Sequence, residues 1–187
     1  KRIFLCVSRV DPQKNQLLLV QAFALIAASH PEHHLVLIGA EVVEEYGRRL
    51  REEIAARGLQ ERVTWIPGLA PDDPALPGAF RAAEAFVLPS AHEPFGIVIL
   101  EAWAASLPVV ATRVGGIPGF TTDAENILLT PSGDAGDMAD KLRTLAGSAD
   151  LRSALARNGF LFAESRYDWP AIARQLLDLY PQPESKS

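Results

Sequence analysis

The sequence predicts an α/β domain, a doubly wound, Rossmann-like parallel sheet of about six strands with helices on both faces. Three observations lead to this fold class. Short apolar segments alternate with longer segments whose apolar residues recur at helical spacing. The short segments are apolar throughout, which is typical of strands covered on both faces. Strands that alternate with helices indicate right-handed βαβ units, and 187 residues with 48% hydrophobic content suit one domain with a sizeable core.

The elements follow in a regular order. The predicted strands cover residues 2–8, 34–38, 62–66, 85–88, 108–112 and 126–130. The predicted helices cover residues 16–29, 42–57, 78–85 and 95–106, and three more lie between Asp137 and Tyr180. Gly58 is placed to cap the second helix, since glycine tolerates the left-handed conformation of a helix C-terminus. We expect all these elements to form one domain at residues 1–180, followed by a disordered tail at 181–187.

Composition and charge argue against several functions. The net charge of −5 disfavours general binding of nucleic acid, which needs a basic surface. The single cysteine, Cys6, cannot form an internal disulfide, and its apolar neighbours favour a small buried side chain over a nucleophile. No apolar segment approaches the roughly 20 residues of a membrane-spanning helix. We expect a cytoplasmic location, and the start at Lys1, directly in a strand, leads us to expect part of a longer protein.

The loop after the first strand carries two cations, Arg9 and Lys14, on either side of a turn that contains Asp11 and Pro12. Ligands of doubly wound sheets bind beyond the carboxyl ends of the strands, so the loops that follow strands are candidate sites. Two cations held by a short loop suit a diphosphate. Two alternatives stay open: both side chains are solvated surface charges, or Arg9 pairs with Asp11.

The loop after the fourth strand leads into a helix, with Pro94 at a favourable position for the helix start. The free backbone N–H groups of Phe95, Gly96 and Ile97 would then point out of the helix N-terminus, where they can hold a phosphate. Gly96 also allows a ligand to approach the backbone closely. Glu93 can accept hydrogen bonds from sugar hydroxyls, and the alternative role for its carboxylate is to cap the helix.

A second carboxylate, Glu101, lies eight residues after Glu93 within an apolar helical stretch. Eight helical residues span roughly 12 Å, about the reach from a sugar to a ribose across a diphosphate. A carboxylate in a buried helix is costly unless it is bonded, so the alternative is a salt bridge to a neighbouring strand. The loop after the fifth strand contains Gly115 and Gly116, a pair that permits unusual backbone conformations but is more often only a turn.

The histidines do not form a recognisable metal site. His30, His33 and His34 cluster at the amino end of a strand, opposite the candidate loops, and no cysteine accompanies them. His92 borders the candidate pocket, and we expect it to be a surface-loop side chain. The sequence therefore predicts neither a bound metal nor another cofactor.

At these residues the sequence resembles glycosyltransferase family 4, the glycosyl transferases group 1, which are retaining enzymes of the two-domain GT-B fold. The segment 93–101, EPFGIVILE, matches the E-x7-E motif of the family, including its Pro, Phe and Gly. The loop from Arg9 to Lys14 resembles the family's G-R-x-x-x-x-K loop, with Ser8 in place of Gly. Two further matches follow in the expected order: residues 108–116 (PVVATRVGG) and residues 167–169 (YDW) before the last helix.

The resemblance implies roles for individual residues of this chain. Arg9, Lys14 and Glu93 correspond to the catalytic positions, the first two as diphosphate cations and the third as the ligand of the donor sugar. The donor-binding positions correspond to Gly68 and Leu69 near the base, Phe95, Gly96 and Ile97 through their backbone, and Glu101 at the ribose. Two positions depart from the family's pattern: Gly119 stands where a Glu is usual, and Ile127 follows Asn126 in place of Gly.

The resemblance also implies that this chain is the C-terminal, donor-binding half of a GT-B enzyme whose N-terminal acceptor domain is absent from it. The parent enzyme would transfer a sugar from a UDP-, GDP- or ADP-linked donor to a hydroxyl acceptor with retention. Aspartates two apart, typical of metal-dependent sugar transferases, do not occur, which favours a metal-independent reaction. We expect the isolated chain to be inactive and the whole enzyme to be cytoplasmic, with peripheral membrane association through the absent domain. The alternatives are a GT-B sugar-nucleotide epimerase and a stand-alone nucleotide-binding module.

Overall fold

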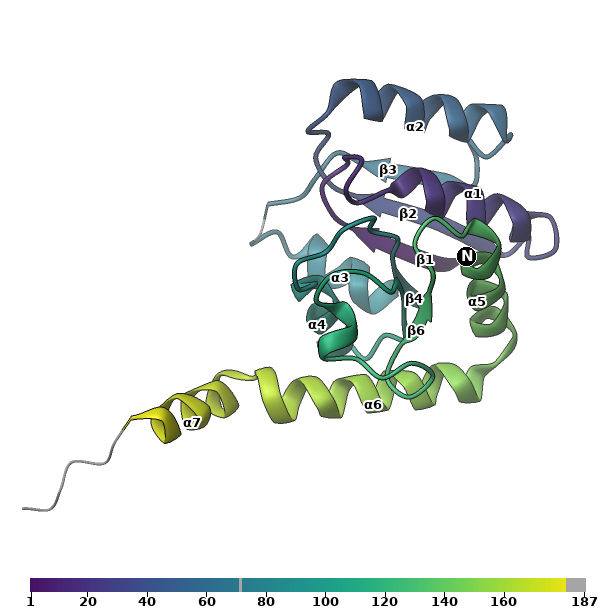
Figure 1. Ribbon diagram of the computed structural model, residues 1–187. Helices are drawn as coiled ribbons and strands as arrows, with labels where there is room; N and C mark the ends of the chain where they lie inside the picture. Colours follow the sequence, from purple (N-terminus) through teal and green to yellow (C-terminus); the bar gives the residue numbers. More distant parts are fainter. Residues whose placement is uncertain (71, 181–187) are drawn as a thin grey trace, which may run out of the picture.

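A computed structural model of the chain describes residues 1–70 and 72–180 and confirms the predicted fold class, a parallel sheet between two layers of helices (Figure 1). The strands are β1 (Arg2–Val7), β2 (His33–Ile38), β3 (Val63–Ile66), β4 (Ala85–Leu88), β5 (Val109–Thr112) and β6 (Leu128–Thr130). The helices are α1 (Gln16–Ala27), α2 (Glu44–Ala56), α3 (Ala75–Ala82), α4 (Ile97–Ala104), α5 (Ala135–Gly147), α6 (Ala149–Tyr167) and α7 (Trp169–Leu179), with a 3-10 turn at Ile117–Gly119. The predicted tail at 181–187 lies outside the described residues.

The strand order is β3-β2-β1-β4-β5-β6, and every neighbouring pair is parallel. The chain builds one half of the sheet outward from β1 and then returns to start the other half at β4. The order therefore reverses between β1 and β4, and the crevice at that point is where such sheets bind ligands.

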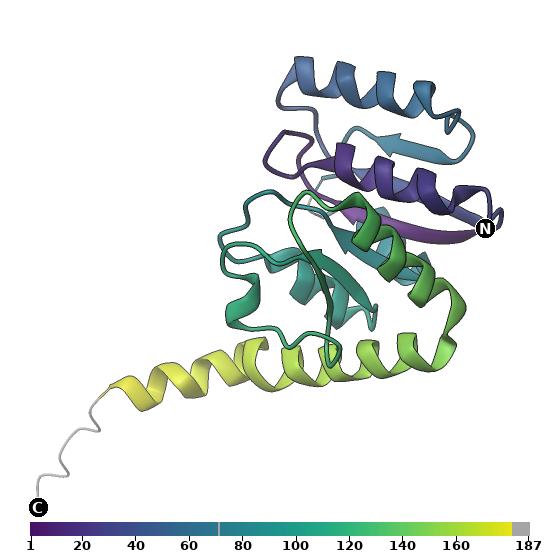
Figure 2. The ribbon, with the colours of Figure 1, turned by 45° about the vertical axis from the view of Figure 1, so that its right-hand side comes forward.

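Alternate residues of each strand face different layers, as a pleated strand requires. In β1, Phe4 and Cys6 pack in the cluster that includes α1, α2 and α5, while Leu5 packs with α3 and α4. Burial raises the pKa of the Cys6 thiol to about 12, so the prediction of a small buried side chain is confirmed. Helix α7 continues away from the sheet in both ribbon views (Figure 1 and Figure 2). Asp168 caps it by accepting a hydrogen bond from the Ala171 N–H at 2.7 Å.

One predicted helix is displaced. The segment expected at 78–85 is helical from Ala75 to Ala82. The helix starts earlier because Asp73 accepts a hydrogen bond from the Ala75 N–H at 2.8 Å and Pro74 already has helical backbone angles. Pro77 does not prevent this start, since the N–H groups of a first turn have no partner within the helix.

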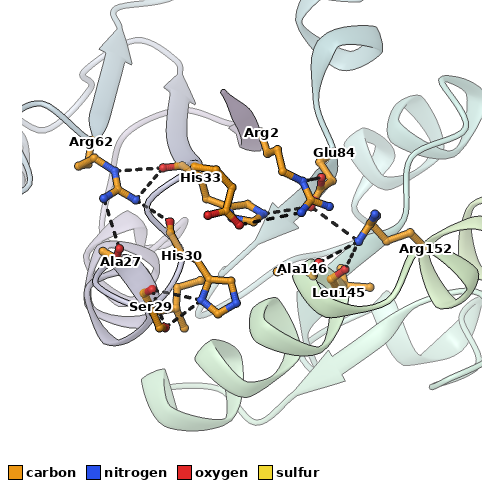
Figure 3. Close-up of polar contacts among 12 residues, drawn as sticks. Arg2, Ala27, Ser29, His30, His33, Arg62, Glu84, Leu145, Ala146 and Arg152 are labelled. Atoms are coloured by element: carbon orange, nitrogen blue, oxygen red, sulfur yellow. Dashed lines mark hydrogen bonds and ion pairs between the residues drawn. The ribbon is translucent and has the colours of Figure 1, made fainter.

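A cluster of charges around Glu84 holds the amino edge of the sheet, by which we mean the side where the parallel strands begin, opposite the candidate loops (Figure 3). Glu84 immediately precedes β4. Arg2 of β1 donates to the Glu84 carboxylate, and Arg152 of α6 lies 3.9 Å from it. The Nε2 atom of His33 is 3.1 Å from Glu84, and the same ring stacks on Phe4. Within residues 1–70 and 72–180, no group of three or more His, Cys, Asp or Glu side chains is arranged to hold a metal ion.

This cluster predicts a stability effect at a position remote from the candidate loops. Glu84→Gln keeps the shape of the side chain but removes the negative charge that Arg2 and Arg152 share, and leaves Arg2 only its 3.9 Å contact with Glu32. We expect a loss of about 3 kcal/mol in the free energy of unfolding, measured by urea denaturation. The matched control is Glu52→Gln, which breaks an exposed pair with Arg48 and should change stability by less than about 0.5 kcal/mol. Equal stabilities of the two variants would contradict the role given to Glu84.

Candidate functional site

Buried polar side chains gather at the carboxyl edge of the sheet, the side where the parallel strands end. Of the nine buried polar or charged residues among those described, six lie at that edge: Asp11, Gln16, Ser90, Glu93, Thr112 and Thr130. Burying a polar group is unfavourable unless it is bonded, so such a concentration indicates a built site. The strand order points to the same edge, because the crevice at the reversal between β1 and β4 opens at the carboxyl ends of the strands.

The loop after β1 is anchored from both ends. The Asp11 carboxylate accepts a hydrogen bond from the backbone N–H of Lys14 at 2.9 Å and lies 3.5 Å from the guanidinium of Arg9. Gln16, which begins α1, donates to Ser8 Oγ at 2.8 Å and to the Arg9 carbonyl at 2.7 Å. The alternative pairing of Arg9 with Asp11 is therefore present, while 60% of the Arg9 side chain stays exposed and can reach a ligand.

The second cation of this loop meets the loop after β4. Lys14 Nζ donates to Glu93 Oε2 at 2.6 Å, and the two side chains are only 15% and 8% exposed. The alternative that Lys14 is a solvated surface charge is thus wrong. Ser90 Oγ donates to the same carboxylate oxygen at 3.4 Å, so Glu93 sits at the centre of a buried polar contact between β1 and β4.

The two glycines after β5 do more than make a turn. The Gly116 N–H donates to the carbonyl of Glu93 at 2.9 Å. A Cβ atom at Gly115 would clash with that carbonyl oxygen, and one at Gly116 would clash with the carbonyl of Pro94. Only residues without a side chain allow this approach, so the glycine pair fixes the backbone position of Glu93.

Helix α4 begins later than predicted. Its first residue is Ile97, and Gly96 precedes it with a φ of +93°. This left-handed residue interrupts helical geometry, so Pro94 and Phe95 belong to the loop and not to the first turn. No side chain caps the helix, which makes the capping alternative for Glu93 wrong. Among the described residues, none accepts a hydrogen bond from the Gly96 or Ile97 backbone N–H.

Phe95 has a packing role that the motif alone did not indicate. Its ring stacks on Phe120 with centroids 4.9 Å apart and meets the edge of Tyr167 at 5.9 Å. Tyr167 belongs to the YDW segment at the end of α6. The aromatic contacts therefore tie the loop after β4 to α6, and they give two of the sequence motifs a common site.

Glu101 is exposed, contrary to the expectation of a buried carboxylate. The sheet-facing side of α4 buries Ile99, Ala102 and Trp103, so Glu101 points outward. No described cation forms a salt bridge with it, and the salt-bridge alternative is wrong. Although the side chain reaches solvent, the surrounding atoms remove part of its hydration, and this desolvation raises the pKa of the carboxyl group. Glu101 lines an open hollow of about 400 Å³ between α3 and α4.

The remaining predicted positions lie on the same edge. Gly68 follows β3 with a φ of +121°, and its exposed backbone is close to Ala40. Leu69 is half-buried and packs with the α3–α4 side of the sheet. His92 is exposed, as expected. Sequence reasoning missed Gln16 and Ser90, because neither has a motif and both are identified only by their burial and hydrogen bonds.

The strand order and these contacts together define the class of protein. It is a Rossmann-like domain in which two cations, Arg9 and Lys14, and the buried Glu93 carboxylate lie where the strand order reverses. A family model for glycosyl transferases group 1 matches residues 1–182, and the chain belongs to that family.

Relatives and solved structures agree with this assignment. The D-inositol 3-phosphate glycosyltransferase of Corynebacterium kroppenstedtii is 33% identical over 178 residues, which cover 93% of this chain and 39% of that protein. HepE of Anabaena, crystallised with UDP and glucose, superimposes with a TM-score of 0.86 at 28% identity over 94% of this chain and 47% of its own.

A third similarity is to a single domain. The C-terminal domain of the group 1 glycosyltransferase LpcC from Francisella tularensis has a TM-score of 0.82 at 27% identity, with 90% of this chain and 87% of that domain covered. The chain thus spans about two fifths of the first of these relatives and about half of HepE. In the described part of the chain, no helix has the length and apolar character needed to cross a bilayer.

The contact of the glycine pair with the loop after β4 predicts a purely steric effect. Gly116→Ala places a Cβ against the Pro94 carbonyl and should lower the free energy of unfolding by about 2 kcal/mol. Gly119→Ala is the matched control, because no atom lies within 4 Å of its Cβ position. That control should stay within about 0.5 kcal/mol of the wild type in thermal or urea unfolding. A Gly116→Ala variant as stable as the control would show that the two loops do not pack as described.

Proposed function

We propose that this chain is the donor-binding half of a retaining, metal-independent glycosyltransferase that moves a sugar from a nucleoside diphosphate sugar to a hydroxyl acceptor. The observation that carries the proposal is the buried contact of Lys14 with Glu93 at the point where the strand order reverses. It joins the two sequence motifs expected to bind the diphosphate and the sugar. Binding of UDP and glucose by HepE, which has the same fold at 28% identity, supports the proposal.

In this proposal the donor lies along the carboxyl edge. The base contacts the backbone of Gly68 and Leu69, and the ribose hydroxyls donate to Glu101 in the hollow between α3 and α4. The family roles of Phe95, Gly96 and Ile97 as backbone contacts to the donor are retained as predictions.

The proposed chemistry needs charge stabilisation more than covalent participation. As the bond from the anomeric carbon to the diphosphate breaks, negative charge grows on the leaving oxygen. Arg9 and Lys14 stabilise that charge, and the fixed loops hold the sugar in the orientation for transfer. Metal independence rests on these cations and on the absence from the sequence of aspartates two residues apart. Retention, a cytoplasmic location and peripheral membrane association stay predictions from the family.

We expect the purified chain to bind a nucleoside diphosphate and its sugar conjugate weakly, without transferring sugar. The reason is that an open hollow leaves much of the ligand in water and no acceptor-binding half is included. Calorimetry with UDP, GDP, ADP and their sugars identifies the base, and addition of EDTA should leave binding unchanged.

Arg9→Ala should weaken binding of the diphosphate, but not of the nucleoside, by about 1.5 kcal/mol or more. Sugar transfer by the chain alone, or an absolute need for Mg²⁺ or Mn²⁺, would contradict the proposal.

Glu101→Gln separates a binding role from a structural one. A carboxyl whose pKa is raised by folding favours the folded state at low pH, and this contribution is lost as the pH rises through the raised pKa. The variant should therefore melt no lower than the wild type at pH 7, and its relative melting temperature should increase between pH 4 and pH 7. It should nevertheless bind nucleoside and nucleoside diphosphate less tightly. A folded variant with full affinity for both would reject the ribose assignment.

A further inference from the structure

Each cation expected to bind the diphosphate already has a carboxylate partner in the structure. Arg9 lies against Asp11, and Lys14 lies against Glu93. The four side chains sum to zero charge, so they do not form a bare cationic pocket. A diphosphate must therefore share these cations with the carboxylates or displace them.

The two pairs differ in how easily they can separate. The Arg9–Asp11 contact is 3.5 Å long and its guanidinium is 60% exposed, so water can replace either partner. The Lys14–Glu93 contact is 2.6 Å long and nearly buried. Removing one partner from such a pair leaves an uncompensated charge in a poorly solvated place. Lys14 can turn toward a diphosphate only when something else compensates Glu93.

The donor sugar has the groups needed for that compensation. Its hydroxyls donate hydrogen bonds, and a carboxylate such as Glu93 accepts them. Resting on the function proposed above, we infer that Glu93 holds Lys14 and releases it only when sugar hydroxyls replace the ammonium group. Lys14 then binds the diphosphate. Glu93 is in this way a specificity-determining residue that couples recognition of the sugar to binding of the leaving group.

The exchange has a consequence for the product. A nucleoside diphosphate without its sugar cannot compensate Glu93, so it competes with that carboxylate for Lys14. The intact donor meets no such competition. The site therefore favours the nucleotide sugar over the free nucleoside diphosphate, and Lys14 returns to Glu93 as the product leaves.

The test is a double-mutant cycle at Lys14 and Glu93, read by calorimetry with UDP and UDP-glucose, or with the GDP or ADP counterparts if the wild type selects that base. Glu93→Gln is isosteric and removes the competing charge. It should raise the affinity for UDP about tenfold, which corresponds to about 1.4 kcal/mol. This is only part of the Coulomb energy of an ion pair at an effective dielectric constant of about 20. The same variant should lose the preference for UDP-glucose over UDP. Lys14→Gln should weaken UDP binding.

The decisive measurement is Glu93→Gln in the Lys14→Gln background, where the gain in UDP affinity should disappear. Glu52→Gln, with the same charge change on the exposed face of α2, should have no effect on either ligand. If Glu93→Gln still raises the UDP affinity in the Lys14→Gln background, the effect is simple repulsion by Glu93 and the inference is overturned. The inference is also overturned if a folded Glu93→Gln variant binds UDP with unchanged or lower affinity. If neither the wild type nor Glu93→Gln binds any nucleoside diphosphate, the proposed function itself is rejected.

Discussion

The meeting of the loops after β1, β4 and β5 is the constraint on which the site depends. Backbone groups make this contact: the Gln13 carbonyl accepts a hydrogen bond from the Ala91 N–H at 2.8 Å, and the Glu93 carbonyl accepts one from Gly116 at 2.9 Å. These contacts are possible because the parallel strands end at one edge and because glycine leaves room for a carbonyl. Given that framework, Lys14 and Glu93 face each other although 79 residues separate them in sequence.

The same dependence explains what could be predicted from the sequence. Strand and helix patterns are local, so the parallel α/β fold and the order of the candidate loops were predictable. The identity of the charge partners was not, because it depends on strand order and on loop approach. Glu101 illustrates the difference: its apolar neighbours suggested burial, but α4 turns Ile99 and Trp103 toward the sheet and leaves Glu101 outside. The start of α4 was also misplaced, since the apolar pattern of the segment does not reveal that Gly96 takes a left-handed conformation, which interrupts the helix.

The network around Glu84 and the proposed binding site lie at opposite edges of the sheet. At the amino edge, the Glu84 carboxylate is joined to partners from β1, β2 and α6, and His33 Nδ1 lies 3.1 Å from the carboxylate of Glu32. At the carboxyl edge, Gln16 Oε1 and Thr130 Oγ1 are buried without a partner among the described residues. Buried polar groups without a partner are unfavourable for folding, so each calls for an explanation such as strain, a functional role or a bound water. The amino-edge network can offset that cost because the two edges belong to one sheet.

In the proposed function, recognition of the diphosphate acts at short range. The net charge of −5 creates a long-range field that does not attract a diphosphate. Beyond about 10 Å such fields are largely screened at ordinary salt concentrations, so the groups that matter are those in contact. Here these are two cations already neutralised by carboxylates, together with N–H groups at the start of α4. If Lys14 and Glu93 exchange partners as inferred above, selectivity follows from which ligand can rearrange those contacts, and a ligand that carries both hydroxyls and a diphosphate satisfies Glu93 and Lys14 at once.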